Sequence, residues 1–287
     1  MILMVSITSR YSHISGGVSM KKWALRLGYF GWNYHGFQRQ PGLRTIEGVV
    51  LGALKRKLGE IQDYSYASRT DRGVSSFGNV ISFSSEIKPI LGALNHDLPW
   101  DVFFLSCKEV STEFNARFAL CREYSYFLLD NGNLNLDKMN AACELVKGEH
   151  DFRYFCKIDK KRKIGKRGYR RKVLDCEVKE GKCGLIVLRI TADSFLWEMA
   201  RRILSAVVSI GRGELDLRDL ELSLELKKKL NVRPLDPIGL VLTGVRYRDL
   251  ELSLDDDVKR RLHKRMCEKI REEGTKFLLI KNFFEAL

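Results

Sequence analysis

Apolar side chains in the first part of the chain recur first with a strand period and then with a helix period. Every second residue is apolar across 22–29, which predicts a half-buried strand whose inner face carries Trp23, Leu25, Leu27 and Tyr29. A stripe with three- to four-residue spacing follows, and Thr45 and Gly59 are suited to begin and end this helix. The run 80–83 predicts the next strand.

The second half of the chain repeats this order of patterns. Alternation over 124–128 predicts a strand, the stripe over 136–146 a helix, and the runs 174–178 and 185–190 two further strands. The remaining predicted elements are a long helix capped by Ser194 that ends at Gly211, a helix capped by Asp216, and a closing strand over 239–247.

These patterns predict an α+β fold made of two pseudo-symmetric halves. Several strands are separated by short intervals, which suit antiparallel neighbours. Each half is therefore expected to be an antiparallel β-sheet with helices on one face, with a cleft between the halves. The predicted divisions are an N-terminal extension over 1–20, an N-terminal half over 21–112, a C-terminal half over 113–250 and a charged tail over 251–287.

The tail from Asp255 combines a charged stretch with an apolar end. Its charged part predicts a helix to about Glu273, and apolar residues follow at 277–280 and 283–284. We interpret it as a docking tail that completes a surface of the body.

Composition places the chain among globular proteins and favours a polyanionic partner. Of the 287 residues, 45% are hydrophobic, which is ordinary for a protein with a core. The net charge of +14 favours nucleic acid, with a membrane surface second and a solvated basic surface as the alternative. Seven cysteines without C-x-x-C spacing indicate reduced thiols in a cytoplasmic protein, and no apolar run reaches the ~20 residues of a membrane span.

Asp71 is the first candidate for chemistry. It lies between Arg69 and Arg72, and Gly73 gives the backbone room to turn. A carboxylate beside fixed positive charge stays ionised at neutral pH, which suits a nucleophile or an electrostatic stabiliser better than a general acid. The alternative is a surface Arg-Asp turn, which is common in proteins.

Arg201 is the second candidate, because its helix is apolar on nearly every side. Trp197, Leu204 and Val208 share its face at helical spacing. A guanidinium in such a stripe is costly unless it is paired, and Asp71 is one possible partner. The alternatives are an arginine that reaches solvent from the helix edge, or one that pairs with Glu198 or Glu214.

Aromatic residues in the middle of the chain suit contact with an unstacked base. Tyr124 and Tyr126 share one strand face and follow the segment Phe114-Asn115-Ala116-Arg117-Phe118. Aromatic rings beside basic residues stack on bases that have left a helix. The alternative is a sheet face packed into the core, which we favour for Tyr126.

A dense basic run over 160–172 surrounds Tyr169. It includes Lys166, Arg167 and Arg170. This run can follow a phosphate backbone, and we favour RNA contact over the alternative of a solvated loop.

Several sequence motifs are missing from the chain. It has no G-x-x-x-x-G-K-[ST] loop, no dinucleotide fingerprint, no H-E-x-x-H pair and no G-x-S-x-G turn. We therefore expect chemistry without a nucleotide cofactor and without a metal ion.

Six short stretches between residues 22 and 248 form an ordered set. They are 22–31, Gly36-Phe37-Gln38-Arg39-Gln40, Arg69-Thr70-Asp71-Arg72-Gly73-Val74, Phe114-Asn115-Ala116-Arg117-Phe118, Gly148-Glu149-His150-Asp151-Phe152 and Phe195-Leu196-Trp197-Glu198-Met199-Ala200-Arg201. In sequence and in order, these stretches resemble the motifs of the tRNA pseudouridine synthase A family. Ser68 and Ser75, which flank the third stretch, resemble the archaeal and eukaryotic branch more than the bacterial one.

The resemblance implies an isomerase that converts uridine to pseudouridine in the anticodon stem-loop of tRNA, at tRNA positions 38–40. It also implies two α+β halves around a cleft, a homodimer, and no cofactor or metal. Carried over by matching motif, Asp71 is the nucleophile, Arg201 pairs with it, Arg69 helps to flip the uridine and Tyr124 packs on the flipped base. The segment 114–118 and Lys166, Arg167 and Arg170 are the expected RNA contacts.

The chain departs from the family's pattern at two places. Trp197-Glu198 stands where a His-His pair is often found, and the tail beyond residue 250 has no counterpart in the family's motifs. The competing hypothesis is a non-catalytic RNA-binding protein on the same scaffold, for which Asp71 would be dispensable.

Overall fold

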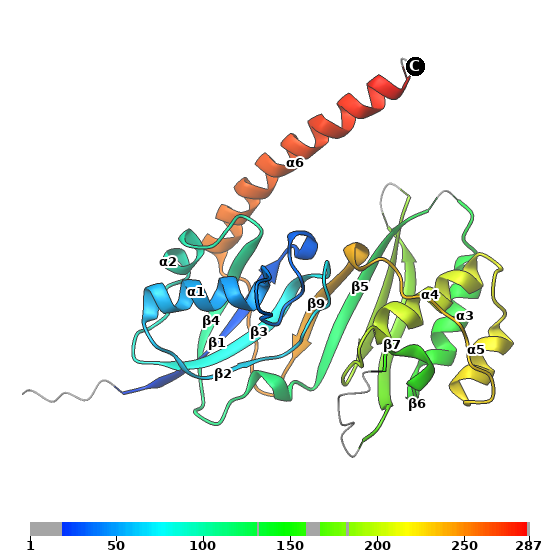
Figure 1. The fold of residues 1–287 in the computed structure, drawn as a ribbon, viewed down its shortest axis with the longest axis horizontal. Helices are drawn as coiled ribbons and strands as arrows, with labels where there is room; N and C mark the ends of the chain where they lie inside the picture. Colours follow the sequence, from blue (N-terminus) through cyan, green and yellow to red (C-terminus); the bar gives the residue numbers. More distant parts are fainter. Residues whose placement is uncertain (1–18, 131, 159–166, 182–183, 286–287) are drawn as a thin grey trace, which may run out of the picture.

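Two halves joined by one β-sheet make up the protein (Figure 1). The computed structural model describes residues 19–130, 132–158, 167–181 and 184–285. Each half has its own large cluster of buried apolar side chains. The α+β class predicted from the sequence is confirmed.

The N-terminal half consists of antiparallel strands and two short-to-medium helices. Its elements are β1 (Lys21–Tyr29), η1 (Gly31–Asn33), α1 (Ile46–Leu58), β2 (Gln62–Tyr66), β3 (Ser75–Ser85), α2 (Leu91–His96) and β4 (Val102–Val110), where η denotes a 3-10 helix. β1 lies between β3 and β4, and β2 pairs with β3. Helix α1 is capped as predicted, because Thr45 Oγ1 accepts a hydrogen bond from Gly48 N at 3.3 Å and Gly59 ends the helix with φ of +73°.

The prediction that β1 is half-buried is wrong, because both of its faces are covered. One face packs in the main cluster of the N-terminal half. Ala24 on the other face packs with Val80 and Ala116 under the segments 114–118 and 245–252, and Ala24 is 0% exposed.

Apolar periodicity missed β2, α2 and β4. β2 is short, and only Tyr64 and Tyr66 of its five residues pack against the core, both of them partly buried. α2 has six residues, and the first five residues of β4 are all buried, so neither shows an alternating pattern. The predicted strand over 80–83 is the middle of the eleven-residue β3.

The C-terminal half places strands against three helices. After η2 (Ala116–Phe118), its elements are β5 (Cys121–Leu129), α3 (Leu136–Val146), β6 (Gly148–Asp151), η3 (Arg153–Phe155), β7 (Arg170–Glu180), β8 (Leu185–Ala192), α4 (Met199–Gly211), α5 (Leu217–Leu224) and η4 (Pro237–Gly239). The strands lie antiparallel in the order β5-β8-β7-β6. Tyr126 is buried in the cluster of this half, as predicted.

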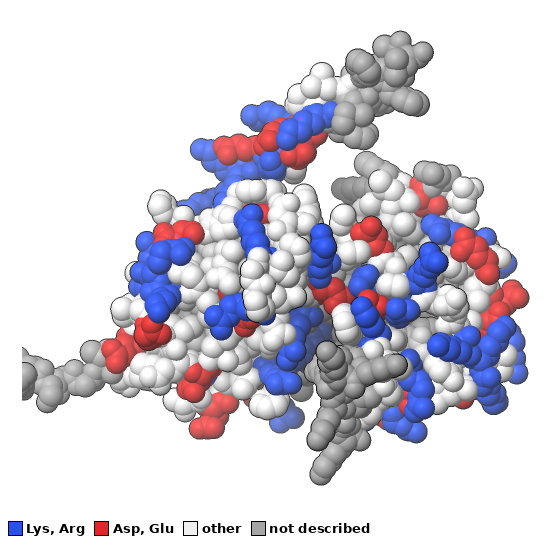
Figure 2. All heavy atoms as spheres, in the orientation of Figure 1, with Lys and Arg blue, Asp and Glu red and all other residues white. Residues whose placement is uncertain are grey.

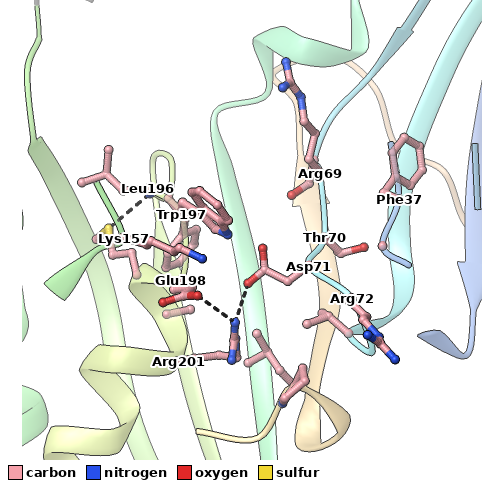
Figure 3. Close-up of a pocket in the computed structure, with 18 of the residues that line it drawn as sticks. Phe37, Arg69, Thr70, Asp71, Arg72, Lys157, Leu196, Trp197, Glu198 and Arg201 are labelled. Carbon is pink, nitrogen blue, oxygen red and sulfur yellow. Dashed lines mark hydrogen bonds and ion pairs between the residues drawn. The ribbon is translucent and has the colours of Figure 1, made fainter. Parts of the chain in front are cut away.

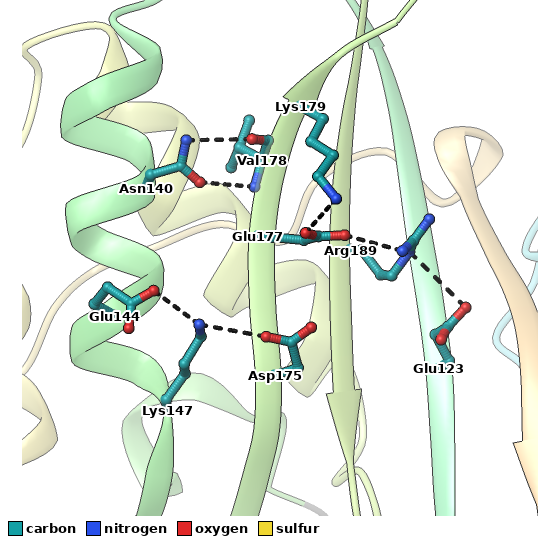
Figure 4. Close-up of polar contacts among 9 residues, drawn as sticks. All are labelled: Glu123, Asn140, Glu144, Lys147, Asp175, Glu177, Val178, Lys179 and Arg189. Atoms are coloured by element: carbon teal, nitrogen blue, oxygen red, sulfur yellow. Dashed lines mark hydrogen bonds and ion pairs between the residues drawn. The ribbon is translucent and has the colours of Figure 1, made fainter.

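Polar contacts fix α3 and the strand register in this half (Figure 4). Asn140 on α3 donates to Val178 O at 3.2 Å and accepts from Val178 N at 2.9 Å, which ties the helix to β7. Arg189 on β8 bonds Glu177, its direct partner on β7, at 2.9 Å and lies 3.9 Å from Glu123 on β5. These charged side chains therefore connect the three neighbouring strands β7, β8 and β5.

The last strand, β9 (Leu240–Arg246), joins the two halves. It pairs parallel to β3 through Ser75 and Ser76 and antiparallel to β5, so that the sheet order is β4-β1-β3-β9-β5-β8-β7-β6 among the described residues. Ser76 Oγ also donates to Leu242 O at 3.1 Å. The two expected sheets are thus continuous with each other.

The predicted cap at Ser194 is wrong, because helix α4 begins five residues later at Met199. Ser194 Oγ instead donates to Asp193 at 3.2 Å. Glu198 holds the N-cap position in the left-handed conformation, with φ of +62°. Residues 195–198 therefore form a turn at the N-terminus of α4.

Helix α6 (Asp256–Glu285) projects from the N-terminal half (Figure 1). Its first turns dock, because Val258 packs against Phe103 and Leu105. The prediction of a helix end near Glu273 is wrong, since the helix continues to Glu285. No helix in the described part of the chain is both long and apolar enough to cross a membrane.

Candidate active site

A cleft of about 1260 Å³ lies between the two halves and contains Asp71. The N-terminal half contributes residues 35–38 and the loop 67–74 between β2 and β3. The C-terminal half contributes Tyr124, the turn 194–198 and the start of α4. Basic side chains flank the hollow between the halves (Figure 2).

A buried polar network fixes the backbone beside Asp71. Asn79, which is 0% exposed, donates to Ser68 O at 3.0 Å and accepts from Ser68 N at 3.2 Å. Tyr29 Oη lies 2.8 Å from Thr70 Oγ1, and Asn79 also donates to Tyr29 Oη at 3.3 Å. Because both neighbours of Arg69 are tied to the sheet, the loop is held on a rigid support.

Two glycines let the chain turn closely around Asp71. Gly73 has φ of +83°, and Gly36 has φ of +89°. A Cβ at Gly36 would lie 3.1 Å from Thr70 O and 3.2 Å from Arg72 N. Glycine therefore fits both the backbone conformation and the close approach of residues 35–37 to the loop.

Asp71 and Arg201 face each other across the cleft (Figure 3). Arg201 Nη2 donates to Asp71 Oδ2 at 2.9 Å, and Nη1 donates to Leu235 O at 2.9 Å. The Arg201 side chain is 10% exposed and that of Asp71 is 25% exposed. Of the partners considered for Arg201, Asp71 is thus the one to which it forms a hydrogen bond. In this partly buried site, charge attraction is less screened than on the surface.

Glu198, one of the alternative partners considered for Arg201, also approaches its guanidinium. Its Oε1 lies 3.8 Å from Arg201 Nη2, and its Oε2 accepts from Arg202 Nε at 3.0 Å and Nη2 at 2.6 Å. These contacts form a chain of alternating charge that runs from Asp71 through Arg201 and Glu198 to Arg202. The signal in the sequence was the acidic residue three positions before Arg201.

Arg69 and Arg72 do not neutralise Asp71, contrary to what their sequence positions indicated. Both side chains point away from the carboxylate in Figure 3. Arg69 Nη1 donates to Gln38 Oε1 at 3.2 Å, and its guanidinium lies over the Tyr66 ring at 5.7 Å. The positive charge that contacts Asp71 comes from Arg201, on the opposite side of the cleft.

Tyr124 lies below the Asp71 loop, where 6% of its surface is exposed. Its hydroxyl lies 2.9 Å from Ser68 Oγ, and its ring meets Phe195 edge to face at 5.1 Å. Burial, opposed by the Ser68 hydrogen bond and reinforced by the nearby Asp71 charge, raises the pKa of Tyr124 to about 12. The side chain is therefore a neutral phenol at neutral pH.

The segment 114–118 is divided between the core and the surface. Phe114 packs on Tyr247 at 5.1 Å, Ala116 is 0% exposed, and Asn115 Oδ1 accepts from Arg117 N at 3.0 Å. Phe118 is 78% exposed, and within this segment the cleft lining includes Arg117. Arg117 is therefore the residue of this segment that reaches the cleft, and the other four residues lie outside the cleft lining.

Of the expected basic contacts, Arg167 and Arg170 lie outside the lining of the cleft. Arg167 forms an ion pair with Asp193, and Arg170 lies on the surface, 3.7 Å from Glu149. Lys166 lies outside the described residues. Arg171, which belongs to the same basic run, and Lys157, which precedes it, both line the cleft.

No group of three or more His, Cys, Asp or Glu side chains is placed to hold a metal ion in the described ranges. The groups with chemical potential are the Asp71 carboxylate, the Arg201 guanidinium and the basic and aromatic side chains around them. A carboxylate paired with a buried arginine in a basic cleft is typical of an enzyme that acts on a polyanionic substrate.

Comparison with known proteins identifies the class of enzyme more closely. A family model described as tRNA pseudouridine synthase matches residues 142–248. Proteins named tRNA pseudouridine synthase A are 38% identical in Thermococcus sibiricus, over 92% of this chain and 99% of that protein, and 38% identical in Pyrococcus furiosus, over 86% and 92%. The Archaeoglobus fulgidus protein of the same name is 36% identical over 93% and 99%.

The chain belongs to the tRNA pseudouridine synthase A family. It is accordingly an isomerase that forms pseudouridine in tRNA. Among solved structures, an archaeal box H/ACA sRNP Nop10–Cbf5 complex overlaps 76% of this chain and 47% of its own at a TM-score of 0.31 and 16% identity, a likeness too low to support an argument.

Proposed function

We propose that the enzyme isomerises uridines of the tRNA anticodon stem-loop, at tRNA positions 38–40, and that Asp71 is its nucleophile. The single observation that carries this proposal is the 2.9 Å bond between Asp71 and the buried Arg201. The pair places a carboxylate within a cleft whose other charged groups are mostly basic. The resemblance of residues 69–74 to the family's motif supports the same role.

The target base has to leave its stack before the glycosidic bond is accessible, at a cost of a few kcal/mol. Arg69 is exposed at the wall of the cleft, where it can occupy the space that the base leaves. We propose that Tyr124, a neutral and mostly buried ring in the lining of the cleft, packs on the flipped uracil.

In the proposed reaction, an Asp71 oxygen bonds to C1′ of the ribose while the N1–C1′ bond breaks. The uracil turns within the cleft, its C5 bonds to C1′, and the carboxylate leaves. C5 then loses its proton, and N1 gains one. Arg201 orients the carboxylate through their hydrogen bond before the attack and after its release.

The remaining parts of the proposal concern the assembly and the surroundings of the enzyme. We propose a cytoplasmic homodimer in which Arg117, Arg167 and Arg170 contact the RNA together with Lys166. Sedimentation of the full chain with and without tRNA measures the oligomeric state.

We also propose that the functional divisions of the chain are an extension over 1–20, halves over 21–112 and 113–250, and a tail over 251–287.

Mapping of pseudouridine in an unmodified tRNA transcript tests the proposed target. After incubation with the enzyme, carbodiimide treatment and primer extension should give new stops at positions 38–40. Asp71→Ala should abolish these stops and still bind the transcript, whereas the exposed Asp137→Ala on α3 should leave them unchanged. Stops confined to other parts of several tRNAs would overturn the proposed target, and full activity of Asp71→Ala would overturn the role of Asp71.

A further inference from the structure

We propose that Trp197 and Lys157 form a binding subsite for the nucleotide next to the target uridine in the RNA chain. In this subsite the indole ring stacks on the neighbouring base, and the Lys157 ammonium contacts a phosphate beside it. The inference rests on the proposed function, which supplies a single-stranded or opened segment of RNA at the cleft, and it adds two residues that bind the substrate outside the reaction centre.

Trp197 lies in the same cleft as Asp71, on the opposite side from Arg69 (Figure 3). It follows the turn residues Phe195 and Leu196 and precedes Arg201 by four residues. The residue that would stack on RNA is therefore attached to the backbone segment that also positions the partner of Asp71.

The backbone on either side of Trp197 is fixed although the indole is exposed. Phe195 and Leu196 pack against the core of the C-terminal half, and Met199 N donates to Leu196 O at 3.1 Å. Lys157 N donates to Trp197 O at 2.9 Å. Yet 44% of Trp197 is exposed, so a rigidly held aromatic ring presents a large apolar area to the cleft. A stacked base would remove that area from water.

The Lys157 ammonium lies 4.2 Å from the centre of the Trp197 ring. This distance is within the range of a cation–π contact. Lys157 has no acidic partner within 4.0 Å among the residues that the structure describes. Its charge is therefore placed beside the ring and is available to a phosphate group.

Burial distinguishes this subsite from the position of the target uracil. Tyr124, next to the Asp71 loop, is 6% exposed and closes the floor of the cleft. The exposed fraction of Trp197 is 44%, about seven times that of Tyr124. Trp197 is therefore accessible to a nucleotide that does not enter the position of the target uracil. A base stacks on an aromatic ring whatever its identity, so the subsite accepts any neighbouring nucleotide.

The first test is single-turnover conversion of a tRNA transcript at increasing enzyme concentration. Trp197→Ala and Trp197→Leu should raise the half-saturating enzyme concentration about 5- to 150-fold, because both lose the aromatic face. Trp197→Phe should retain most of the affinity. Phe127→Ala is the matched control, since Phe127 is 40% exposed on β5 and outside the cleft lining. Equal affinity of Trp197→Leu, Trp197→Phe and the unchanged enzyme would overturn the stacking role.

The second test removes the base instead of the side chain. Transcripts with an abasic nucleotide on the 5′ or the 3′ side of the target should bind more weakly to the unchanged enzyme. On one of the two abasic RNAs, the effect of Trp197→Ala should fall to less than about twofold, as expected when both partners of one contact are lost. An undiminished effect on both RNAs would show that Trp197 acts through protein packing.

The third test separates the phosphate contact from the stacking contact. Lys157→Ala should reduce the slope of log affinity against log salt concentration by about 0.7 to 0.9, while Trp197→Ala should leave the slope unchanged. An unchanged slope for Lys157→Ala would overturn its phosphate contact. A failure of the proposed function has a different signature, because the unchanged enzyme itself would then form no pseudouridine in the anticodon arm.

Discussion

At the scale of single residues, Asp71 is held by groups from both halves of the protein. Asn79 and Tyr29 fix the backbone of its loop from the sheet of the N-terminal half. Arg201 contacts its carboxylate from the C-terminal half and is itself oriented by Leu235 O. The position of one carboxylate oxygen therefore depends on side chains that are distant in sequence and close in the fold.

The Asn79 network should affect both stability and turnover. Asn79→Ala leaves Ser68 N and Ser68 O without their partner, which should cost about 2 to 4 kcal/mol in the free energy of unfolding. Urea unfolding measures this loss, and initial rates at a temperature where the variant is folded should also fall. Asn140→Ala is the matched control, because Asn140 contacts Val178 in the same two-bond way but far from the cleft. If both variants lost stability and neither lost turnover, Asn79 would be a purely structural residue.

Tyr124 should make stability depend on alkaline pH. Its pKa of about 12 in the folded protein lies above the ordinary value of 10.0. The phenol therefore contributes stability that is complete below pH 10 and is lost as the pH rises through 12. Between pH 8 and pH 11, the unchanged protein should lose about 1 kcal/mol more than Tyr124→Phe in urea unfolding. Parallel losses in the two proteins would contradict the shifted pKa of Tyr124.

Sequence reasoning found Asp71 and Arg201 because each carries a local signal. Asp71 stands in a charged turn with a glycine, and Arg201 is a lone charge in an apolar stripe. It named Asp71 as one possible partner of Arg201, and the two side chains do form a hydrogen bond. It was wrong to expect the flanking Arg69 and Arg72 to supply the positive charge beside Asp71, because both side chains point away from the carboxylate. Asn79 and Lys157 carry no such signal, because their importance comes from tertiary contacts alone.

At the scale of elements, the join between β3 and β9 determines how the two sides of the cleft face each other. β3 begins directly after the Asp71 loop, and β9 begins directly after the segment that includes Leu235 and lines the cleft at 236–238. Their short parallel pairing through Ser75 and Ser76 thus fixes both Asp71 and a support of Arg201.

Gly78 on β3 tests the importance of this join. A Cβ at this position would lie 2.4 Å from Thr243 O and 2.8 Å from Gly244 Cα, so Gly78→Ala should push β9 away from β3. We expect a loss of about 2 kcal/mol or more in unfolding free energy and a lower rate of pseudouridine formation. Gly92→Ala on α2 is the control, because its nearest neighbour is the flexible end of Arg261 at 3.5 Å. If Gly78→Ala left the free energy of unfolding unchanged, the pairing of β3 with β9 would tolerate this displacement, and the account of the join would be wrong.

Elements with clear periodicity were predicted well, and those shaped by tertiary packing were not. Helix α1, helix α3 and strand β5 follow their apolar patterns. The start of α4 was misplaced because a serine resembled a cap, while the cleft requires a turn over 195–198. β2 was missed because it has five residues and only two of them are aromatic, and β4 was missed because its first five residues are all buried and show no alternation.

At the scale of the whole molecule, the +14 net charge is consistent with an enzyme that binds a polyanion. Arginines line the cleft at several places, including Arg117, Arg122 and Arg171. The sequence could indicate this charge and the two halves. It could not indicate that a single sheet runs through both halves, because the pairing of β3 with β9 spans 166 residues, from Ser76 to Leu242.

The charge should appear as a strong salt dependence of tRNA binding. With about four phosphate contacts, the affinity for a tRNA transcript should fall about 100-fold between 50 and 200 mM monovalent salt. Filter binding or fluorescence anisotropy at several salt concentrations measures the slope. A change below about threefold would favour the alternative of a basic surface that serves solubility alone.

The most direct test of the account is single-turnover conversion by Asp71→Asn. The amide keeps the shape of the side chain and an oxygen that can accept from Arg201, but it cannot act as the carboxylate nucleophile. The variant should bind tRNA within about threefold of the unchanged enzyme and form pseudouridine at least about 1000-fold more slowly. Turnover within about tenfold of the unchanged enzyme, measured by mass spectrometry of digested nucleosides, would contradict the assignment of Asp71 as the nucleophile.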